Sequence, residues 1–201
     1  MLDDGRGLIS SRRTESVTAR VNHPPVALAG PDRHICPGDP VAFDGSASSD
    51  RDGGILRHLW RLSDGAAAEG ARVERRFEAP GSVTATLAVT DDSGSACAMA
   101  AAAASVRVNA APVVNAGPDR EVFTGAAHAA VAFAAISSDP DGDGLTLTWE
   151  FGDGTSASGA AVTHRYAAAG TYTVTPTARD VTVLSCGIAR DSATIRVTAR
   201  D

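Results

Sequence analysis

Acidic residues at alternating positions are the strongest candidates for chemistry in this chain. The segment "SSDPDGDG" places Asp139, Asp141 and Asp143 two residues apart, and "SSDRDGG" places Asp50 and Asp52 in the same way. Carboxylate oxygens are the hard ligands that calcium prefers in proteins. The structural alternative is that these Asp-Gly runs are ordinary turns, in which each carboxylate accepts hydrogen bonds from nearby backbone N–H groups. Both interpretations place the acidic residues in loops.

No catalytic constellation accompanies the acidic residues. The chain has five histidines, but none belongs to an HExxH pair or adjoins a recognisable serine or cysteine nucleophile motif. His164 is better explained by a structural hydrogen bond than by catalysis. The segment "GDGTSASG" has the glycine density of a phosphate loop, but it lacks the Lys-Ser/Thr ending and a following helix. We therefore predict that the protein is not an enzyme.

Composition indicates a folded chain and narrows its partners. Hydrophobic residues make up 43% of the 201 positions and charged residues 21%, which is enough apolar material for a core. The net charge of -6 offers no basic footprint for a nucleic acid. Nowhere do 18 apolar residues run uninterrupted, so we expect no membrane insertion, and the first residues have no signal-peptide pattern. The sequence is therefore either cytoplasmic or, as the repeats favour, an internal piece of a longer exported protein.

Two segments of the chain repeat each other. "NHPPVALAGPDR" begins at Asn22 and "NAAPVVNAGPDR" begins 87 residues later at Asn109, while Trp60 and Trp149 are 89 residues apart. We therefore predict unit one at residues 22–108 and unit two at residues 109–201, meeting near residues 108–112 through a short linker. Residues 1–21 resemble the end of unit one, and we interpret them as the last strand of a preceding repeat, left as an exposed edge.

The apolar spacing within each unit is typical of β-strands. Val83, Ala85, Leu87 and Val89 alternate with small or polar residues, and a similar alternation surrounds Tyr172 to Ala178. Each unit offers about seven short strands separated by Gly, Pro, Asp and Ser clusters, as in a sandwich. Two stretches depart from the pattern. We expect residues 96–105 to be an irregular loop entering a strand, and Pro176 to need a bulge or an edge position.

Unit two carries a recognisable hairpin motif in "WEFGDGTSASGAAVTHRYAAAGTYTV", where Trp149, Phe151, Gly152, Asp153 and Gly154 stand together. This segment resembles the PKD (polycystic kidney disease) repeat, with Glu150 replacing the usual aspartate. Unit one is degenerate there, and the resemblance covers roughly residues 22–201. It implies an all-β protein of two tandem immunoglobulin-like (PKD) β-sandwiches, found mainly in extracellular, cell-surface or periplasmic proteins.

The resemblance also implies the kind of function to expect. PKD repeats commonly serve as non-catalytic spacer or adhesion modules that contact proteins or surfaces. The alternative is a substrate- or glycan-targeting accessory module of a secreted hydrolase. We expect the partners to be neighbouring repeats of the parent protein, with a protein or glycan ligand as a further option. Glycan binding needs an exposed aromatic platform, and the core claims most of the few rings, which favours the spacer.

Topology gives the acidic residues a common location. In an immunoglobulin-like sandwich the start of the first strand, the loop between the second and third strands, and the loop between the last two strands gather at one end. We therefore predict a calcium-binding pole in each unit. The predicted ligands are Asn22, Asp50, Asp52 and Asp91 in unit one, and Asn109, Asp139, Asp141 and Asp180 in unit two. The prediction also resembles calcium sites in PKD-like domains of bacterial collagenases, although Val181 and Gly54 replace acidic neighbours.

The three cysteines leave several pairings open. Cys36 and Cys97 belong to unit one, Cys186 is the counterpart of Cys97 in unit two, and Phe123 stands where unit two would need a counterpart of Cys36. One option is a Cys36–Cys97 bridge within unit one. A rival is a Cys36–Cys186 bridge across the junction, which would leave Cys97 for a cysteine of a preceding repeat. The third option is that the thiols are free and buried.

Overall fold

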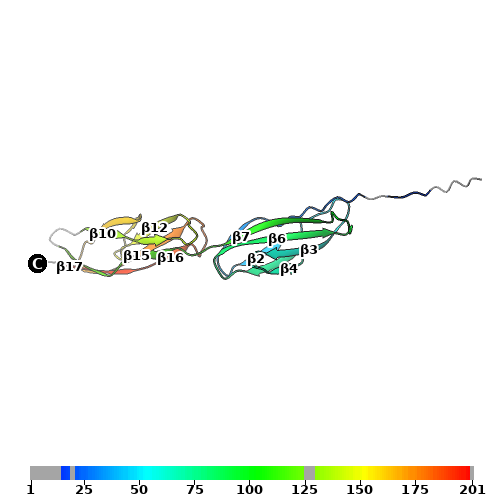
Figure 1. Ribbon diagram of the computed structural model, residues 1–201. Coiled ribbons are helices and arrows are strands. Elements are labelled where there is room, and N and C mark those ends of the chain that lie inside the picture. Colours follow the sequence, from blue (N-terminus) through cyan, green and yellow to red (C-terminus); the bar gives the residue numbers. More distant parts are fainter. Residues whose placement is uncertain (1–14, 19–20, 125–129, 200–201) are drawn as a thin grey trace, which may run out of the picture.

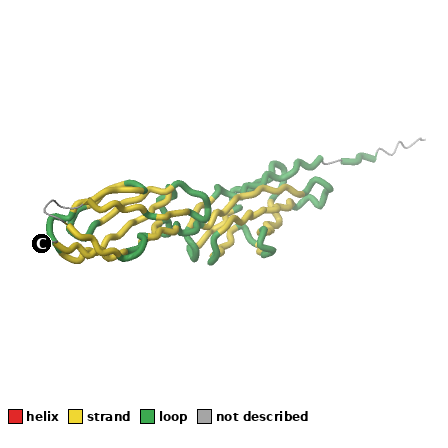
Figure 2. The backbone as a smooth tube through the Cα atoms, turned by 60° about the vertical axis from the view of Figure 1, so that its left-hand side comes forward, coloured by secondary structure: helices red, strands yellow, loops and turns green. Residues whose placement is uncertain are grey.

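The computed structural model describes residues 15–18, 21–124 and 130–199, and these form two β-sandwiches placed end to end (Figures 1 and 2). The described residues contain no α-helix, and accordingly none that could cross a membrane. The observed fold class is the predicted one: all-β, with two tandem immunoglobulin-like sandwiches. The two sandwiches together form an elongated rod, with the C-terminus at the unit-two end and the N-terminal segment at the unit-one end (Figure 1).

Unit one has seven strands among the described residues. Five form one sheet in the order β1-β7-β6-β3-β4, and β2 pairs with β5 in a second, facing sheet. All neighbouring strands are antiparallel except β1 and β7, which are parallel. The strands are β1 (Arg33–Ile35), β2 (Pro40–Asp44), β3 (Ile55–Leu62), β4 (Ala67–Glu69), β5 (Arg72–Arg76), β6 (Gly81–Asp91) and β7 (Met99–Val108).

Unit two repeats this plan with more interruptions. Its main sheet has the order β13-β12-β15-β17-β9, with β16 also pairing with β15, and two smaller sheets join β10 to β14 and β8 to β11. The strands are β8 (Val113–Asn115), β9 (Arg120–Thr124), β10 (Ala130–Ala134), β11 (Ile136–Ser138), β12 (Leu145–Glu150), β13 (Ser156–Ser158), β14 (Ala161–Arg165), β15 (Gly170–Asp180), β16 (Ile188–Arg190) and β17 (Ala193–Ala199).

A tryptophan anchors the core of each unit. Trp60 on β3 and Trp149 on β12 are both fully buried. The ring centroid of Trp60 lies 5.4 Å from that of Phe43, and Trp149 lies 5.6 Å from Phe133. Each indole Nε1–H donates to a glycine carbonyl after the next strand, over 3.1 Å to Gly70 and 3.0 Å to Gly159. Hydrogen-bonding the indole N–H lets so large a ring be buried without a desolvation cost for its polar atom.

Gly152 explains why the hairpin motif needs a glycine after the aromatic strand. Its φ is 80°, a left-handed conformation that side chains disfavour, and a Cβ there would lie 2.7 Å from the carbonyl oxygen of Thr173. Only glycine lets the turn pass this close to β15. The turn therefore holds Phe151 against the core, where 1% of the residue is exposed.

Two local expectations are resolved by strand pairing. The alanine-rich segment is irregular only up to Ala98, because β7 begins at Met99 and pairs with β6 along its length; the expected loop was too long. Pro176 pairs with Trp149 of β12, and on its other side β15 changes partner from β17 to β16. The carbonyl of Pro176 faces that other side, where it accepts from the N–H of Asp191 over 3.3 Å and where no ladder bond requires the N–H that proline lacks. The predicted strand remnant at residues 1–21 lies mostly outside the described residues, and residues 15–18 and 21 form no strand.

Candidate functional site

The acidic loop of unit two is a compact cluster of carboxylates. Oxygens of Asp139, Asp141 and Asp143 all lie within 4.8 Å of one another. Asp139 Oδ1 accepts hydrogen bonds from the backbone N–H groups of Asp141 (2.8 Å) and Asp143 (3.2 Å). Asp139 Oδ2 is buried and has no hydrogen-bond partner. One oxygen of Asp139 therefore shapes the turn, while the other remains available to a ligand.

Asn109 and Asp180 complete this end of unit two. The Asn109 side-chain amide donates to Asp180 Oδ2 over 3.0 Å, and Asn109 is fully buried with its Oδ1 lacking any partner. Burial by itself would raise the pKa of Asp180, but hydrogen bonds from Thr182 and Asn109 outweigh it, and the pKa lies below its usual range. Asp180 is therefore held as a carboxylate at neutral pH.

Unit one builds the same arrangement at its own N-terminal end. The Asn22 amide donates to Asp91 Oδ2 over 3.0 Å, and hydrogen bonds from Ser93 and Asn22 hold the pKa of Asp91 below its usual range. Asp50 Oδ1 accepts from the N–H groups of Asp52 (2.8 Å) and Gly53 (2.9 Å), whereas Asp50 Oδ2 is buried without a partner. The unpartnered oxygen of Asp139 therefore recurs at the equivalent residue of unit one.

The structure thus gathers each predicted set of four residues at one end of its unit. We call them the unit-one pole (Asn22, Asp50, Asp52 and Asp91) and the unit-two pole (Asn109, Asp139, Asp141 and Asp180). In each pole one aspartate also contacts the residue that follows the asparagine. Asp52 Oδ2 lies 3.2 Å from the backbone nitrogen of His23, which donates to it, and 3.2 Å from the ring Nδ1 of His23. Asp141 Oδ2 accepts from the N–H of Ala110 over 2.6 Å. The role of these residues as metal ligands stays a prediction.

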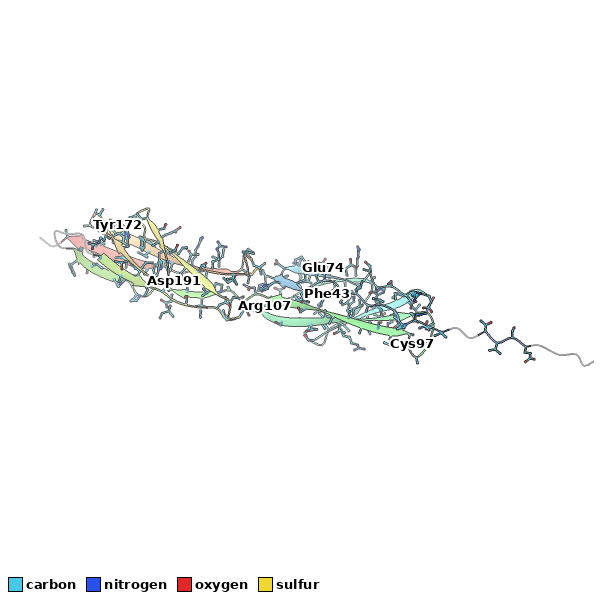
Figure 3. All side chains as sticks on the ribbon, turned by 90° about the horizontal axis from the view of Figure 1, so that it is seen from above. Phe43, Glu74, Cys97, Arg107, Tyr172 and Asp191 are labelled. Carbon is cyan, nitrogen blue, oxygen red and sulfur yellow. A yellow bond between two sulfur atoms is a disulfide. The ribbon has the colours of Figure 1, made fainter. Side chains whose placement is uncertain are left out.

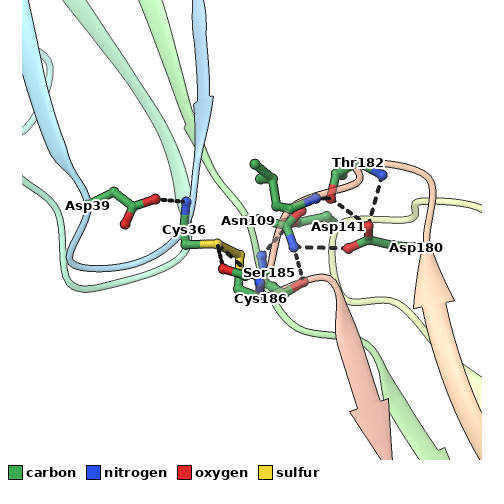
Figure 4. Close-up of a disulfide and its surroundings, with 10 residues drawn as sticks. Cys36, Asp39, Asn109, Asp141, Asp180, Thr182, Ser185 and Cys186 are labelled. Atoms are coloured by element: carbon green, nitrogen blue, oxygen red, sulfur yellow. Dashed lines mark hydrogen bonds between the residues drawn. A yellow bond between two sulfur atoms is a disulfide. The ribbon is translucent and has the colours of Figure 1, made fainter.

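A disulfide bridges the junction between the units. Cys36, at the end of β1, is bonded to Cys186, in the loop between β15 and β16, with a Cα–Cα separation of 5.7 Å (Figure 4). The linker N–H of Asn109 also donates to the Ile35 carbonyl over 2.9 Å. Of the open pairings, the structure contains the one across the junction, and Cys97 is a free, exposed thiol. The bridge within unit one is not formed.

Arg107 also joins the two units, and sequence reasoning did not single it out. From β7 its guanidinium donates to the Asp141 carbonyl over 3.2 Å and forms an ion pair with Asp143 over 3.1 Å. The one sequence signal for this contact is the position of Arg107, a basic residue two positions before the start of unit two. The acidic loop of unit two therefore serves the junction as well as the pole.

The remaining candidates have structural roles. His164 Nε2 lies 2.7 Å from Asp153 Oδ2, and its ring stacks on Phe151 with centroids 4.1 Å apart. Asp153 also accepts from the hydroxyl of Thr155 over 2.6 Å, which fixes the hairpin turn. The pair is thus part of the motif that supports the core, as expected for His164.

Three features together indicate the family of the chain: one buried tryptophan in each unit, the Gly-Asp-Gly turn, and the two tandem sandwiches. The PKD domain family matches residues 22–106 and residues 109–198, and the chain belongs to this family. Such domains are generally non-catalytic binding or spacer modules and are typically extracellular.

Solved structures of tandem immunoglobulin-like domains share the architecture. An I-band fragment of titin is similar with a TM-score of 0.57 at 13% identity, over 89% of this chain and 67% of that chain. Immunoglobulin domains 1–5 of Sidekick-1 give a TM-score of 0.53 at 12% identity, over 89% of this chain and 40% of that chain. At these identities the likeness shows the fold alone.

Proposed function

We propose that this protein is a non-catalytic extracellular spacer that holds the parts attached to its two ends at a fixed distance and orientation. The bridged junction carries the proposal. A single linker leaves rotation about its backbone bonds, so consecutive domains move relative to each other by default. Here a second covalent connection, Cys36–Cys186, joins the units beside the linker, and Arg107 adds a polar contact. These connections add to the linker and therefore oppose rotation about its backbone bonds.

The distribution of aromatic rings favours the spacer over the glycan-targeting alternative. Both tryptophans, Tyr166 and four of the five phenylalanines are buried, Tyr172 is half-buried, and Phe123 is exposed at 56%. Sugar-binding surfaces stack pyranose rings on exposed aromatic side chains. Among the described residues Phe123 is the one strongly exposed ring, and no second exposed ring stands with it as a platform.

The disulfide also supports an extracellular or periplasmic location. Structural disulfides form and persist in oxidising compartments and are rare in the reducing cytosol. A bridge that closes a 150-residue separation restricts the unfolded chain strongly, so its contribution to stability is large where it forms. A spacer exposed to shear and proteases benefits from this restriction.

We propose further that calcium binds the two poles and stiffens the rod. The support is that Asp50 Oδ2, Asp139 Oδ2 and Asn109 Oδ1 are buried oxygens without hydrogen-bond partners, beside other carboxylates. Buried polar atoms are nearly always paired, and a hard cation satisfies several oxygens at once. In unit two the ion would be held by Asn109, Asp139, Asp141 and Asp180, next to the linker, where it neutralises their mutual repulsion.

The stiffness of the junction is measurable in solution. We expect residual dipolar couplings from both units to fit one common alignment tensor, because a rigid pair orients as a single body. In the double variant Cys36→Ser/Cys186→Ser the tensors of the two units should diverge in magnitude. Cys97→Ser is the matched control, since it removes a thiol outside the junction and should leave one tensor.

Two different tensors in the oxidised, unaltered chain would contradict the spacer proposal. A second contradicting result would come from the double variant with Arg107→Ala added. If this protein still aligned like the parent, the disulfide and the Arg107 contact would not explain the rigidity. Small-angle scattering of the same proteins checks that the maximum dimension stays that of an extended rod.

A further inference from the structure

The loop that carries the free Cys97 has the same internal structure as the loop that carries the bridged Cys186. In unit one, Asp91 N–H donates to the Ala98 carbonyl and Ala98 N–H donates to the Ser95 carbonyl. In unit two, Asp180 N–H donates to the Gly187 carbonyl and Gly187 N–H donates to the Leu184 carbonyl. The two loops therefore present their cysteines on equivalent backbone frames.

Backbone conformation and the flanking polar groups extend this equivalence. Gly94 has a φ of 65°, and its counterpart Val183 has a φ of 56° although it is β-branched. Asp91 Oδ1 accepts from the N–H and hydroxyl of Ser93, as Asp180 Oδ1 does from Thr182. Glycine adopts the left-handed conformation freely, but a valine is held in it only where the surrounding structure requires it. The shared turn is thus a feature of both loops.

The main difference between the two cysteines is what lies against them. At the junction, Cys36, which follows β1 of unit one, is bonded to Cys186. Cys97 lies at the far end of unit one, away from the junction (Figure 3), beside a hollow of about 560 Å³. Its lining residues are Val21, Asn22, Asp52, Asp92, Ser93 and Ser95. The chain enters unit one here through Asn22, as it enters unit two through Asn109.

We infer that Cys97 is an attachment site for a disulfide to another PKD-type module stacked on the unit-one pole. The partner cysteine lies at the end of that module's first strand, in the position that Cys36 occupies in unit one. This inference rests on the proposed spacer function in one respect, that modules are stacked in series. The equivalence of Cys97 with Cys186, which is bridged in this way, carries it.

The thiol is suited to exchange. Cys97 Sγ is exposed and lies 3.3 Å from Ser95 Oγ and 3.6 Å from Asn22 Nδ2, so a disulfide reagent can reach it. With oxidised glutathione as the oxidant, the Cys97 thiolate attacks one glutathione sulfur and displaces the other glutathione as a thiolate. The partner thiolate then attacks Cys97 Sγ, forms the protein disulfide and releases the second glutathione. Two protein thiols lose two protons, and the glutathione disulfide takes up their two electrons.

The test places a module before unit one. A copy of residues 22–108 carrying Cys97→Ser replaces residues 1–21, so that the copied Val108 leads into Asn22 as Val108 leads into Asn109. This three-unit protein is refolded in a glutathione redox buffer. We expect no free thiol, and a peptide that joins Cys97 to the Cys36 sequence. Changing the remaining Cys97 to serine is the matched control, which should leave one free thiol.

Two free thiols in the folded three-unit protein would overturn the inference, as would Cys97 bonded only to glutathione. A second measurement uses the unaltered chain, in case the longer protein fails to fold. Oxidised glutathione should add one glutathione to Cys97 while both units stay folded, and a thiol that reacts only after unfolding would also overturn the inference. Neither result affects the dipolar couplings of the Cys36–Cys186 junction, so the two proposals fail separately.

Discussion

Replacing Trp149 with alanine removes the largest buried side chain of unit two. The indole packs against Phe133 and donates a hydrogen bond to the Gly159 carbonyl over 3.0 Å. Truncating a buried tryptophan costs about 3–5 kcal/mol, because transfer free energy is lost and a cavity remains. Trp149→Phe keeps most of the apolar volume but leaves the Gly159 carbonyl unpaired, and it should cost about 1–3 kcal/mol.

The expected change is large against the stability of a single domain. Domains of this size unfold with about 5–15 kcal/mol, so the alanine variant loses a large fraction of the total. At roughly 4–8 °C per kcal/mol for a domain of 60–100 residues, the melting transition of unit two should fall by about 12–40 °C. The phenylalanine variant should lie between the parent and the alanine variant.

The assay separates the two units. Differential scanning calorimetry follows both transitions, and in the Trp149→Ala protein Trp60 is the sole remaining tryptophan, so its fluorescence reports unit one alone. Unit one should melt as in the parent, and Trp60→Ala should produce the reverse pattern. A Trp149→Ala protein whose unit-two transition was unchanged would refute the assignment of the indole to the core, and with it the structural reason for the hairpin motif.

Three further results are expected. Millimolar calcium should raise the melting temperature relative to chelator, and at a calcium concentration ten times Kd the free energy of unfolding should rise by about 1.4 kcal/mol. Asp139→Asn should abolish the increase in unit two. If calcium gave no shift and no binding heat, the acidic loops would be plain turns. The pKa of Asp180 is lower in the folded protein, so the ionised carboxylate stabilises the fold at a pH above the unfolded pKa, and this contribution is lost as the pH falls through the folded pKa. The urea midpoint should therefore drop between about pH 5 and pH 2, and it should drop less steeply in Asp180→Asn. Val183→Gly should raise stability by about 1 kcal/mol in urea unfolding, since it relieves a β-branched residue at a φ of 56°, whereas a loss would show that its side chain is needed.

Sequence alone gave a correct account of the fold because the relevant signals are local. Alternation along Val83 to Val89 and the Trp149 to Gly154 motif depend on side chains two to five residues apart, and an internal repeat tests each assignment twice. The acidic poles were also accessible, because the order of strands in an immunoglobulin-like sandwich determines which loops share an end. The loop expected at residues 96–105 was too long because a run of alanines shows no alternation of apolar and polar residues, whereas pairing with β6 along ten residues makes a strand from Met99 onward.

What the sequence determined by itself is therefore the family, the strand pattern and the polar residues at each pole. Tertiary structure decided which cysteines meet, because Cys36 and Cys186 lie 150 residues apart and their pairing depends on how two separately folded units are stacked. It also decided that Arg107 reaches Asp143 and that Asp139 keeps one buried oxygen unpaired. Such contacts arise between surfaces of different units or loops, where no short-range spacing in the chain records which side chains will face each other.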